Sequence, residues 1–232
     1  MVNDALNKTI NWSWRDVIKL LFITFVFVPI FIEYVLHEFF YMLFQDSLYS
    51  GTLMGLVMAI VFTVSLYLIA LKPYGYSWNT VGVRRFSNGY WKWIVVWSII
   101  LIIGSVIILV LMEFFNISWE NEKTESLQRN ITWYTFVIGF VSAAIISPIY
   151  EEIFYRGFLY KWFRGKYGIA AGMFISSFIF MVVHIPTYNT LPINFISGLV
   201  FAWTYEKTGS VLPAIIIHGI YNGIAVVLTL LA

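Results

Sequence analysis

Long, almost unbroken apolar stretches constrain this chain more than any other feature of its sequence. A helix needs about 20 apolar residues to cross a bilayer, and seven stretches approach that length: 17–44, 51–71, 93–115, 133–160, 168–185, 190–205 and 210–231. Backbone polar groups must be paired inside lipid, and the ten-residue alternation of a membrane β-barrel is not seen. The sequence therefore predicts an all-α, polytopic integral membrane protein with about seven transmembrane helices, within a range of six to eight.

The composition agrees with this class and excludes several others. Hydrophobic residues make up 60% of the chain and charged residues 11%, with a mean hydropathy of +0.82; soluble domains have roughly 45–50% and 25%. A soluble globule, a disordered chain and a nucleic-acid binder are therefore excluded. There is no cysteine, which excludes disulfides, thiolate metal sites and cysteine nucleophiles. The first stretch contains Pro29, and it is expected as one long tilted helix or as a span followed by an interfacial turn.

The basic residues indicate how the chain is oriented in the membrane. The predicted loops on one side contain eleven of the fourteen lysines and arginines: Lys8, Arg15, Lys19, Lys72, Arg84, Arg85, Lys92, Lys161, Arg164, Lys166 and Lys207. The opposite loops contain only Lys123 and Arg129, among several glutamates. Because cytoplasmic loops are enriched in lysine and arginine, we expect a cytoplasmic N-terminus and an external loop over residues 116–132.

The fourth predicted span contains three ionisable residues, in the string EEIFYRG at positions 151–157. Each such residue costs roughly 2.5–3.5 kcal/mol in a bilayer and is a functional candidate for that reason. Glu152 and Arg156 are four residues apart, the spacing of a helical ion pair, and Glu151 is turned from Glu152 by about 100°. One carboxylate can thus be held by the arginine while the other acts as an acid or base. The alternative is an interhelical salt bridge that serves assembly only.

Histidines occur in two later spans, in the strings FMVVH, which ends at His184, and HGIYN at positions 218–222. Asn222 follows His218 by one helical turn. A single membrane histidine is commonly a packing residue, but an acid, two imidazoles and an amide together suit water activation and oxyanion stabilisation. A further group in the first span is interpreted as structural or as lining a substrate entrance: Glu33, His37 and Glu38.

Three other intramembrane protease chemistries do not fit the sequence. A zincin site requires HExxH, and Tyr41 stands where the second histidine should follow His37 and Glu38. An aspartyl protease requires two aspartates within the membrane, and all three aspartates lie outside the predicted spans. A rhomboid-like serine site expects Gly-x-Ser-Gly, but Phe195 replaces the first glycine before the Ser-Gly pair at 197–198.

The strings EEIFYRG, FMVVH and HGIYN, in this order and each on a predicted span, resemble the three motifs of the CPBP family. This family contains the type II CAAX prenyl endopeptidases and the bacterial bacteriocin-processing, self-immunity and abortive-infection proteins. The resemblance covers residues 131–232, and residues 1–130 match only as hydrophobic spans. It therefore implies a CPBP-type helical bundle, with N-terminal transmembrane helices over 1–130 and a catalytic core over 131–232 in one membrane domain.

The resemblance also implies an activity, an intramembrane endopeptidase that cleaves membrane-associated or lipidated peptides. Carried over from that family, Glu151 and His184 would activate water, and His218 and Asn222 would stabilise the oxyanion. Glu152 and Arg156 would hold the fourth helix in place. Glu151, His184 and His218 would also form a zinc site of two imidazoles and one carboxylate. A metal-free glutamate mechanism fits the same residues and is preferred here.

A different class of function stays open from the sequence, a non-proteolytic transporter or a regulatory scaffold with a buried Glu/His/Arg network. Buried ionisable residues also form proton relays, but no inverted repeat supports a transporter. The expected partners are a peptide or protein substrate at the membrane and the lipid bilayer, without nucleic acid. Size and resemblance indicate a bacterial plasma membrane protein, with CAAX-type, bacteriocin or pheromone processing or self-immunity as its task.

Overall fold

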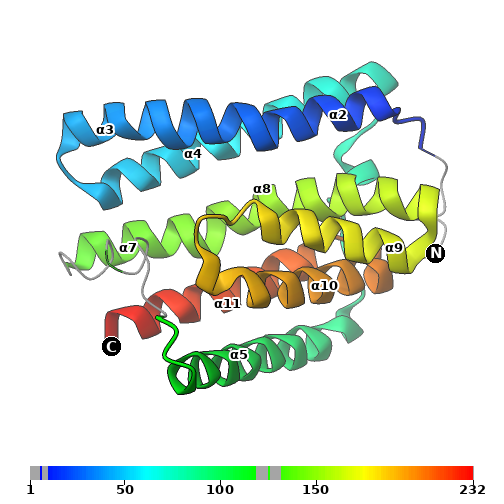
Figure 1. Ribbon diagram of the computed structural model, residues 1–232. Coiled ribbons are helices and arrows are strands. Elements are labelled where there is room, and N and C mark those ends of the chain that lie inside the picture. The colour runs from blue at the N-terminus through cyan, green and yellow to red at the C-terminus, as the bar shows by residue number, and fades with distance from the viewer. Residues whose placement is uncertain (1–5, 7–9, 119–124, 126–131, 232) are drawn as a thin grey trace. The chain divides into compact units, whose positions relative to one another are not determined.

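The computed structural model is built from helices (Figure 1). It describes residues 6, 10–118, 125 and 132–231, and no strand occurs in these ranges. Five helices are long and apolar enough to cross a membrane: Trp14–Phe44, Ser47–Tyr74, Asn88–Phe114, Trp133–Val182 and Leu212–Leu230. The prediction of an all-α, polytopic membrane protein is therefore confirmed. The predicted external loop, which contains Lys123 and Arg129, falls largely outside the described residues.

The seven predicted spans all lie on helical segments. The stretch Trp133–Val182 holds two predicted spans as two helices joined at a kink at Gly168, whose φ of 85° and ψ of 175° are not helical and suit glycine. The sixth predicted span corresponds to α10 (Leu191–Thr208), which is not among the five helices above. The first span is one continuous helix, because a π-helical stretch, η1 (Ile23–Leu36), carries the chain through Pro29.

The helices form two compact units, each of which takes residues from before and after position 130. The first unit comprises Met1–Ile10, Trp78–Asn121 and Glu151–Tyr221. Its described elements are η4 (Trp78–Val81), η5 (Asn88–Tyr90), α5 (Trp91–Phe114), η7 (Ile153–Tyr160), α9 (Lys161–Val182), η8 (Tyr188–Thr190), α10 and the first half of α11 (Leu212–Leu231). Within this unit α10 packs against α9, α5 and η7 (Figure 1).

Small side chains allow α9 and α10 to approach closely. Ser176 and Ser177 on α9 and Ser197 on α10 are buried, and a Cβ added to Gly198 would lie 2.9 Å from the Cβ of Ser177. Close packing of small residues is a common way to associate helices in lipid, where the hydrophobic effect between helices is absent. The Ser-Gly pair at 197–198 is thus explained by helix packing.

The second unit comprises Asn11–Ser77, Glu122–Tyr150 and Asn222–Ala232. Its described elements are α2 (Trp14–Phe22), η1, α3 (His37–Phe44), α4 (Ser47–Leu66), η2 (Tyr67–Leu71), η3 (Lys72–Tyr74), α7 (Trp133–Val141), η6 (Ser142–Ile146), most of α8 (Ser147–Glu152) and the end of α11. The centre of this unit is α4, which packs against α3, η1, α7 and η6. The Asp46 side chain begins α4 by accepting hydrogen bonds from the backbone N–H groups of Leu48 and Tyr49.

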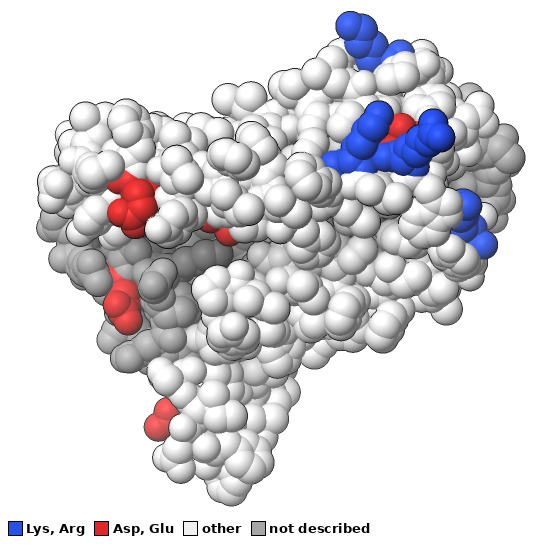
Figure 2. Space-filling model, turned by 45° about the horizontal axis from the view of Figure 1, so that its top comes forward, with Lys and Arg blue, Asp and Glu red and all other residues white. Residues whose placement is uncertain are grey.

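The surface fits a lipid environment. Figure 2 shows a face that is almost entirely uncharged, with lysines, arginines and acidic side chains confined to a few small groups. Many large apolar side chains are exposed, including Phe31 at 53%, Ile60 at 62% and Val110 at 62%. Exposed apolar area of this extent marks an interaction surface, and lipid chains cover it in a membrane protein.

A matched pair of glycine substitutions tests the packing of η4 against η7. A Cβ on Gly157 would overlap the carbonyl oxygen of Val81 and lie 2.9 Å from the Cβ of Val81, whereas Gly165 has nothing within 4 Å. We expect Gly157→Ala to lower the free energy of unfolding by roughly 1–3 kcal/mol, the usual cost of overpacking. Gly165→Ala should leave it unchanged or raise it, because alanine favours helix. An SDS titration of the two purified variants measures the difference, and equal stabilities would contradict the packing described.

Candidate active site

Glu152 lies at the centre of a buried polar cluster in the first unit. Its side chain is completely buried at the end of α8, where η7 begins. Glu152 Oε1 accepts a hydrogen bond from Arg156 Nη1 at 3.1 Å and lies 2.9 Å from His218 Nδ1 on α11. The predicted ion pair between Glu152 and Arg156 is therefore present. The Glu152 carboxylate also contacts His218, which lies 66 residues later in the chain.

Aromatic rings surround the Arg156 guanidinium, which is also completely buried. Its Cζ lies 4.3 Å from the ring centroid of Phe180, 5.1 Å from that of Phe201 and 5.8 Å from that of Tyr155. Arg156 Nη2 donates to the carbonyl oxygen of Gly198 at 3.3 Å. The arginine thus connects η7 with α9 and α10, and the ring faces contribute cation–π attraction to a desolvated charge.

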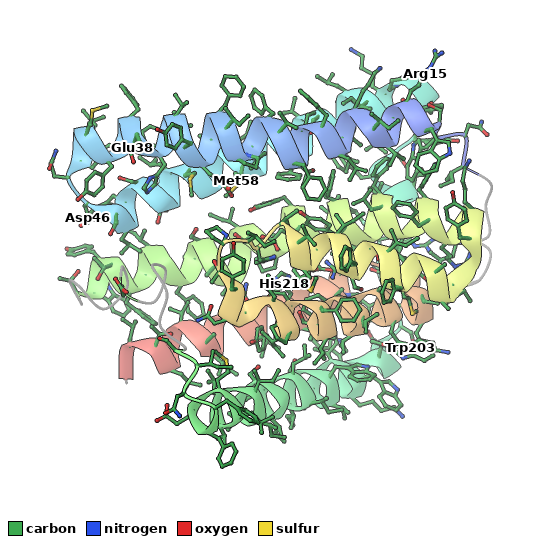
Figure 3. All side chains as sticks on the ribbon, in the orientation of Figure 1. Arg15, Glu38, Asp46, Met58, Trp203 and His218 are labelled. Atoms are coloured by element: carbon green, nitrogen blue, oxygen red, sulfur yellow. The ribbon has the colours of Figure 1, made fainter. Side chains whose placement is uncertain are left out.

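Glu151 is in a different environment from Glu152, although the two are neighbours in the sequence. The Glu151 side chain is 15% exposed, and its Oε2 lies 3.9 Å from His218 Nε2. His218 therefore sits between two carboxylates, with Nδ1 towards Glu152 and Nε2 towards Glu151. Figure 3 labels His218, whose side chain lies in the interior of its unit. A carboxylate that is partly accessible and beside an imidazole is suited to general acid–base chemistry.

His184 lies just beyond the C-terminal end of α9. Its Nδ1 is 2.7 Å from the carbonyl oxygen of Phe180; because a carbonyl can only accept, Nδ1 donates, and a neutral ring keeps its lone pair on Nε2. The Phe180 ring contacts His184 at a centroid distance of 4.8 Å and His218 at 5.9 Å. The two imidazoles from separate helices thus share one aromatic neighbour.

Asn222, one turn after His218 on α11, belongs to the second unit. There its Nδ2 donates a hydrogen bond to the carbonyl oxygen of Ala143 on η6 at 2.9 Å. The group in the first span is in the second unit as well: Glu33 and Glu38 are exposed, and the half-buried His37 stacks on Tyr41. The interpretation of that group as structural or as lining a substrate entrance stays a prediction.

Sequence reasoning missed two contributors to the cluster. Phe201 stacks on His218 with a centroid distance of 4.8 Å and an interplanar angle of 21°, and no sequence signal distinguished it from other apolar residues of its span. Gly198 provides the carbonyl that accepts from Arg156, and it attracted notice only as part of a Ser-Gly pair. Both residues lie on the sixth predicted span, and a search for the face of that span that packs against the three motifs could have found them.

The side chains were also tested as a metal site. Zinc requires ligand atoms at about 2.0–2.2 Å and usually three protein ligands at a catalytic site. Over 10–118 and 132–231 and at the isolated described positions, no three His, Cys, Asp or Glu side chains gather closely enough to hold a metal ion. Glu151, His184 and His218 as placed therefore do not fit a zinc ion, and no step below depends on one.

Comparisons with known proteins point to one family. Residues 132–224 match the family described as type II CAAX prenyl endopeptidase Rce1-like. The membrane-embedded CAAX protease MroQ of Staphylococcus aureus (strain USA300) is 28% identical over 154 residues, 60% of this chain and 60% of that protein. The UPF0177 protein YbdI of Lactococcus lactis subsp. lactis (strain IL1403) is 27% identical over 109 residues, 44% of this chain and 54% of that protein. A UPF0177 protein from the abiGi 5' region of Lactococcus lactis subsp. cremoris is 23% identical over 172 residues, 70% and 68% of the two chains.

The chain thus spans less than two thirds of MroQ and of YbdI. No solved structure matches it. The matched region contains the candidate site residues of the three motifs: Glu151, Glu152, Arg156, His184, His218 and Asn222.

Proposed function

We propose that this chain is an intramembrane endopeptidase of the CPBP family, because residues 132–224 match the family of Rce1-like type II CAAX prenyl endopeptidases. Its substrates would be membrane-associated or lipidated peptides. One observation carries the proposal: His218 lies between a buried carboxylate and a partly accessible one, Glu152 and Glu151, among helices long enough to span a bilayer. Acid, base and imidazole at one buried position are the groups that peptide hydrolysis requires.

In the proposed reaction Glu151 is the general base, acting together with His184. Glu151 takes a proton from water, and the water oxygen adds to the carbonyl carbon of the scissile peptide bond. His218 and Asn222 stabilise the oxyanion that forms, and the proton is delivered to the leaving amine as the C–N bond breaks. Glu152 and Arg156 support this arrangement by holding η7 against α10 and α11.

The proposed mechanism is a metal-free glutamate mechanism. It uses groups that the chain itself provides, with Glu151 Oε2 3.9 Å from His218 Nε2. Cleavage should therefore continue at an unchanged rate in the presence of a strong chelator. A loss of activity that added zinc restores would contradict this part of the proposal.

The relatives support a bacterial origin and a task at the plasma membrane. One of them is called a CAAX protease and another comes from an abi region, both in bacteria. We propose peptide substrates of that kind for this chain: CAAX-type C-termini, bacteriocin or pheromone precursors, or peptides handled in self-immunity. The peptide and its cleavage site can be found by comparing the membrane peptides of cells that express the wild-type protein or Glu151→Gln.

A cleavage assay in proteoliposomes tests the proposed function directly. Peptides enriched in the Glu151→Gln cells are offered to the reconstituted wild-type protein, which should cut them at one position, and to Glu151→Gln, which should not. A transporter or scaffold with a buried Glu/His/Arg network would leave every peptide intact. Transport of the peptide into the vesicles without cleavage would replace the protease proposal by that alternative.

The proposed orientation has its own test, because the chain contains no cysteine. Arg85 and Ile117 are exposed and lie on either side of α5, whose 24 residues span about 36 Å. With a cytoplasmic N-terminus, an impermeant maleimide added to intact cells should label Arg85→Cys only after lysis and should label Ile117→Cys at once. The reverse pattern would invert the topology.

A further inference from the structure

We propose that Glu152 is a positioning residue that fixes the proton of His218 on Nδ1 and thereby directs the Nε2 lone pair towards Glu151. The two groups meet at 2.9 Å, between Glu152 Oε1 and His218 Nδ1, and Glu152 is completely buried. The placement of the proton follows from this geometry alone. Its consequence for catalysis rests on the proposed function.

In this contact the Glu152 carboxylate accepts and His218 donates. A guanidinium stays charged in proteins and can only donate, and Arg156 Nη1 donates to the same Oε1 at 3.1 Å. An ionised carboxylate can only accept, so the hydrogen between Glu152 and His218 belongs to Nδ1. A neutral imidazole has one N–H, and the lone pair is therefore on Nε2.

Packing prevents the ring from turning over to exchange its two nitrogens. Phe201 is stacked on His218 at 4.8 Å, and the Phe180 ring meets it edge-on at 5.9 Å. The imidazole is only 5% exposed. Aromatic contacts on two sides in a close-packed interior hold the ring plane in place, so the nitrogen that faces Glu151 is always Nε2.

The tautomer decides whether Glu151 can act as a base. Nε2 lies 3.9 Å from Glu151 Oε2, and catalytic contacts of this kind commonly tighten when substrate binds. A proton on Nε2 would be donated to the Glu151 carboxylate and would reduce its basicity. With a lone pair on Nε2 the ring makes no such donation, and the carboxylate keeps its capacity to take a proton from water.

The same nitrogen then provides a path for that proton. Glu151 Oε2 breaks the O–H bond of water and passes the proton to Nε2, while the water oxygen bonds to the carbonyl carbon. The positive imidazolium is balanced by Glu152, and its Nε2–H becomes the oxyanion donor required of His218. The proton leaves with the amine when the C–N bond breaks, which returns the lone pair to Nε2.

Nitrogen-15 NMR of histidine-labelled protein tests the proposal without substrate. The chain has three histidines, so His37→Gln and His184→Gln assign the signals of His218 by elimination. The wild type should show Nδ1 protonated and Nε2 bare. In Glu152→Gln the amide oxygen should turn to Arg156 and the NH2 group to His218, which moves the proton to Nε2. Cleavage should fall by roughly 10⁴-fold, as for other enzymes whose catalytic histidine is held in the wrong tautomer.

Arg156→Gln is the matched control, because it breaks the same ion pair but leaves the carboxylate acceptor in place. It should keep the proton on Nδ1. Glu206→Gln is the second control, because the Glu206 carboxylate binds Arg164 and Tyr160 outside the site. The tautomer of His218 should be unchanged in this variant, and the cleavage rate should stay within a few-fold of the wild-type rate. If Glu152→Gln does not fold, Glu152→Asp withdraws the carboxylate by one methylene and should give a mixture of tautomers.

Three results would overturn the positioning role: a proton on Nε2 in the wild type, no change of tautomer in the folded Glu152 variants, or the same change in Arg156→Gln. The last would show that loss of the ion pair, and not loss of the acceptor, disturbs the ring. A protein that shows the expected tautomers but cleaves no peptide would refute the proposed function and leave the role of Glu152 intact.

Discussion

Replacing Glu151 by glutamine is expected to lower the rate of peptide cleavage by about 10³-fold or more, the scale seen when one member of a catalytic set is removed. Glutamine keeps the size and polarity of the side chain but cannot take a proton from water. The Glu151 side chain is also the one carboxylate of the cluster with 15% exposure, so its replacement leaves the buried ion pair intact. Initial rates in proteoliposomes measure the effect, and membrane insertion should be unchanged.

Because the proposed catalytic groups act as a unit, their losses should not multiply. His184→Ala and His218→Ala should each reduce cleavage on the same scale, and combining either with Glu151→Gln should lower the rate little further. Glu113→Gln removes an exposed carboxylate of α5 and should cleave at a rate within a few-fold of the wild type. A wild-type rate in any of the three single variants, or losses that multiply in the double variants, would contradict the assigned set.

The membrane fold could be predicted because it follows from two quantities that a sequence displays, the length and the hydropathy of its apolar stretches. The details that hydropathy leaves open depend on single residues, whose backbone preferences a hydropathy profile does not contain. Gly168 adopts a positive φ that is not helical, so the stretch Trp133–Val182 is two helices joined at a kink. Pro29 does not break the first helix, because the π-helical stretch Ile23–Leu36 accommodates it.

The site could be predicted only as far as helical periodicity reaches. A spacing of four residues predicts the Glu152–Arg156 ion pair, which is present in the structure. The contact between Glu152 and His218 joins residues 66 positions apart, and no local pattern specifies it. Periodicity also predicts that Asn222 lies one turn from His218. It does not predict that the Asn222 amide donates to the Ala143 carbonyl, because this contact depends on the packing of another helix.

Depth along the helices was a poorer guide than side-chain contacts. Counting 1.5 Å per residue places His184 about 24 Å from the cytoplasmic face if its helix runs upright from Gly168, against about 12–15 Å for Glu151 and His218. The structure nevertheless has Phe180 in ring contact with both histidines. Residue counts assume upright helices that start at their first residue, and the bend at Gly168 shows why that assumption is unsafe here.

Removing the charge of Arg156 should cause a large loss of stability. We expect Arg156→Ala to lower the free energy of unfolding by about 3–5 kcal/mol, because it leaves the buried Glu152 carboxylate without its counter-charge. The substitution also removes the hydrogen bond to the Gly198 carbonyl and the guanidinium stacked on Phe180. Arg85→Ala, at an exposed position, is the control and should change stability by less than about 0.5 kcal/mol.

A double-mutant cycle separates the cost of an unpaired charge from the cost of lost packing. Arg156→Met fills part of the aromatic surroundings without a charge, and Glu152→Gln removes the carboxylate that would otherwise be left unpaired. The double variant should be more stable than the sum of the two single losses predicts, by about 1 kcal/mol or more, since residues in one ion pair couple by 0.5–3 kcal/mol. SDS titrations of the four purified proteins give the coupling. Additive losses would mean that the pair contributes packing only, and that η7 is held against α10 by the aromatic rings and not by its charges.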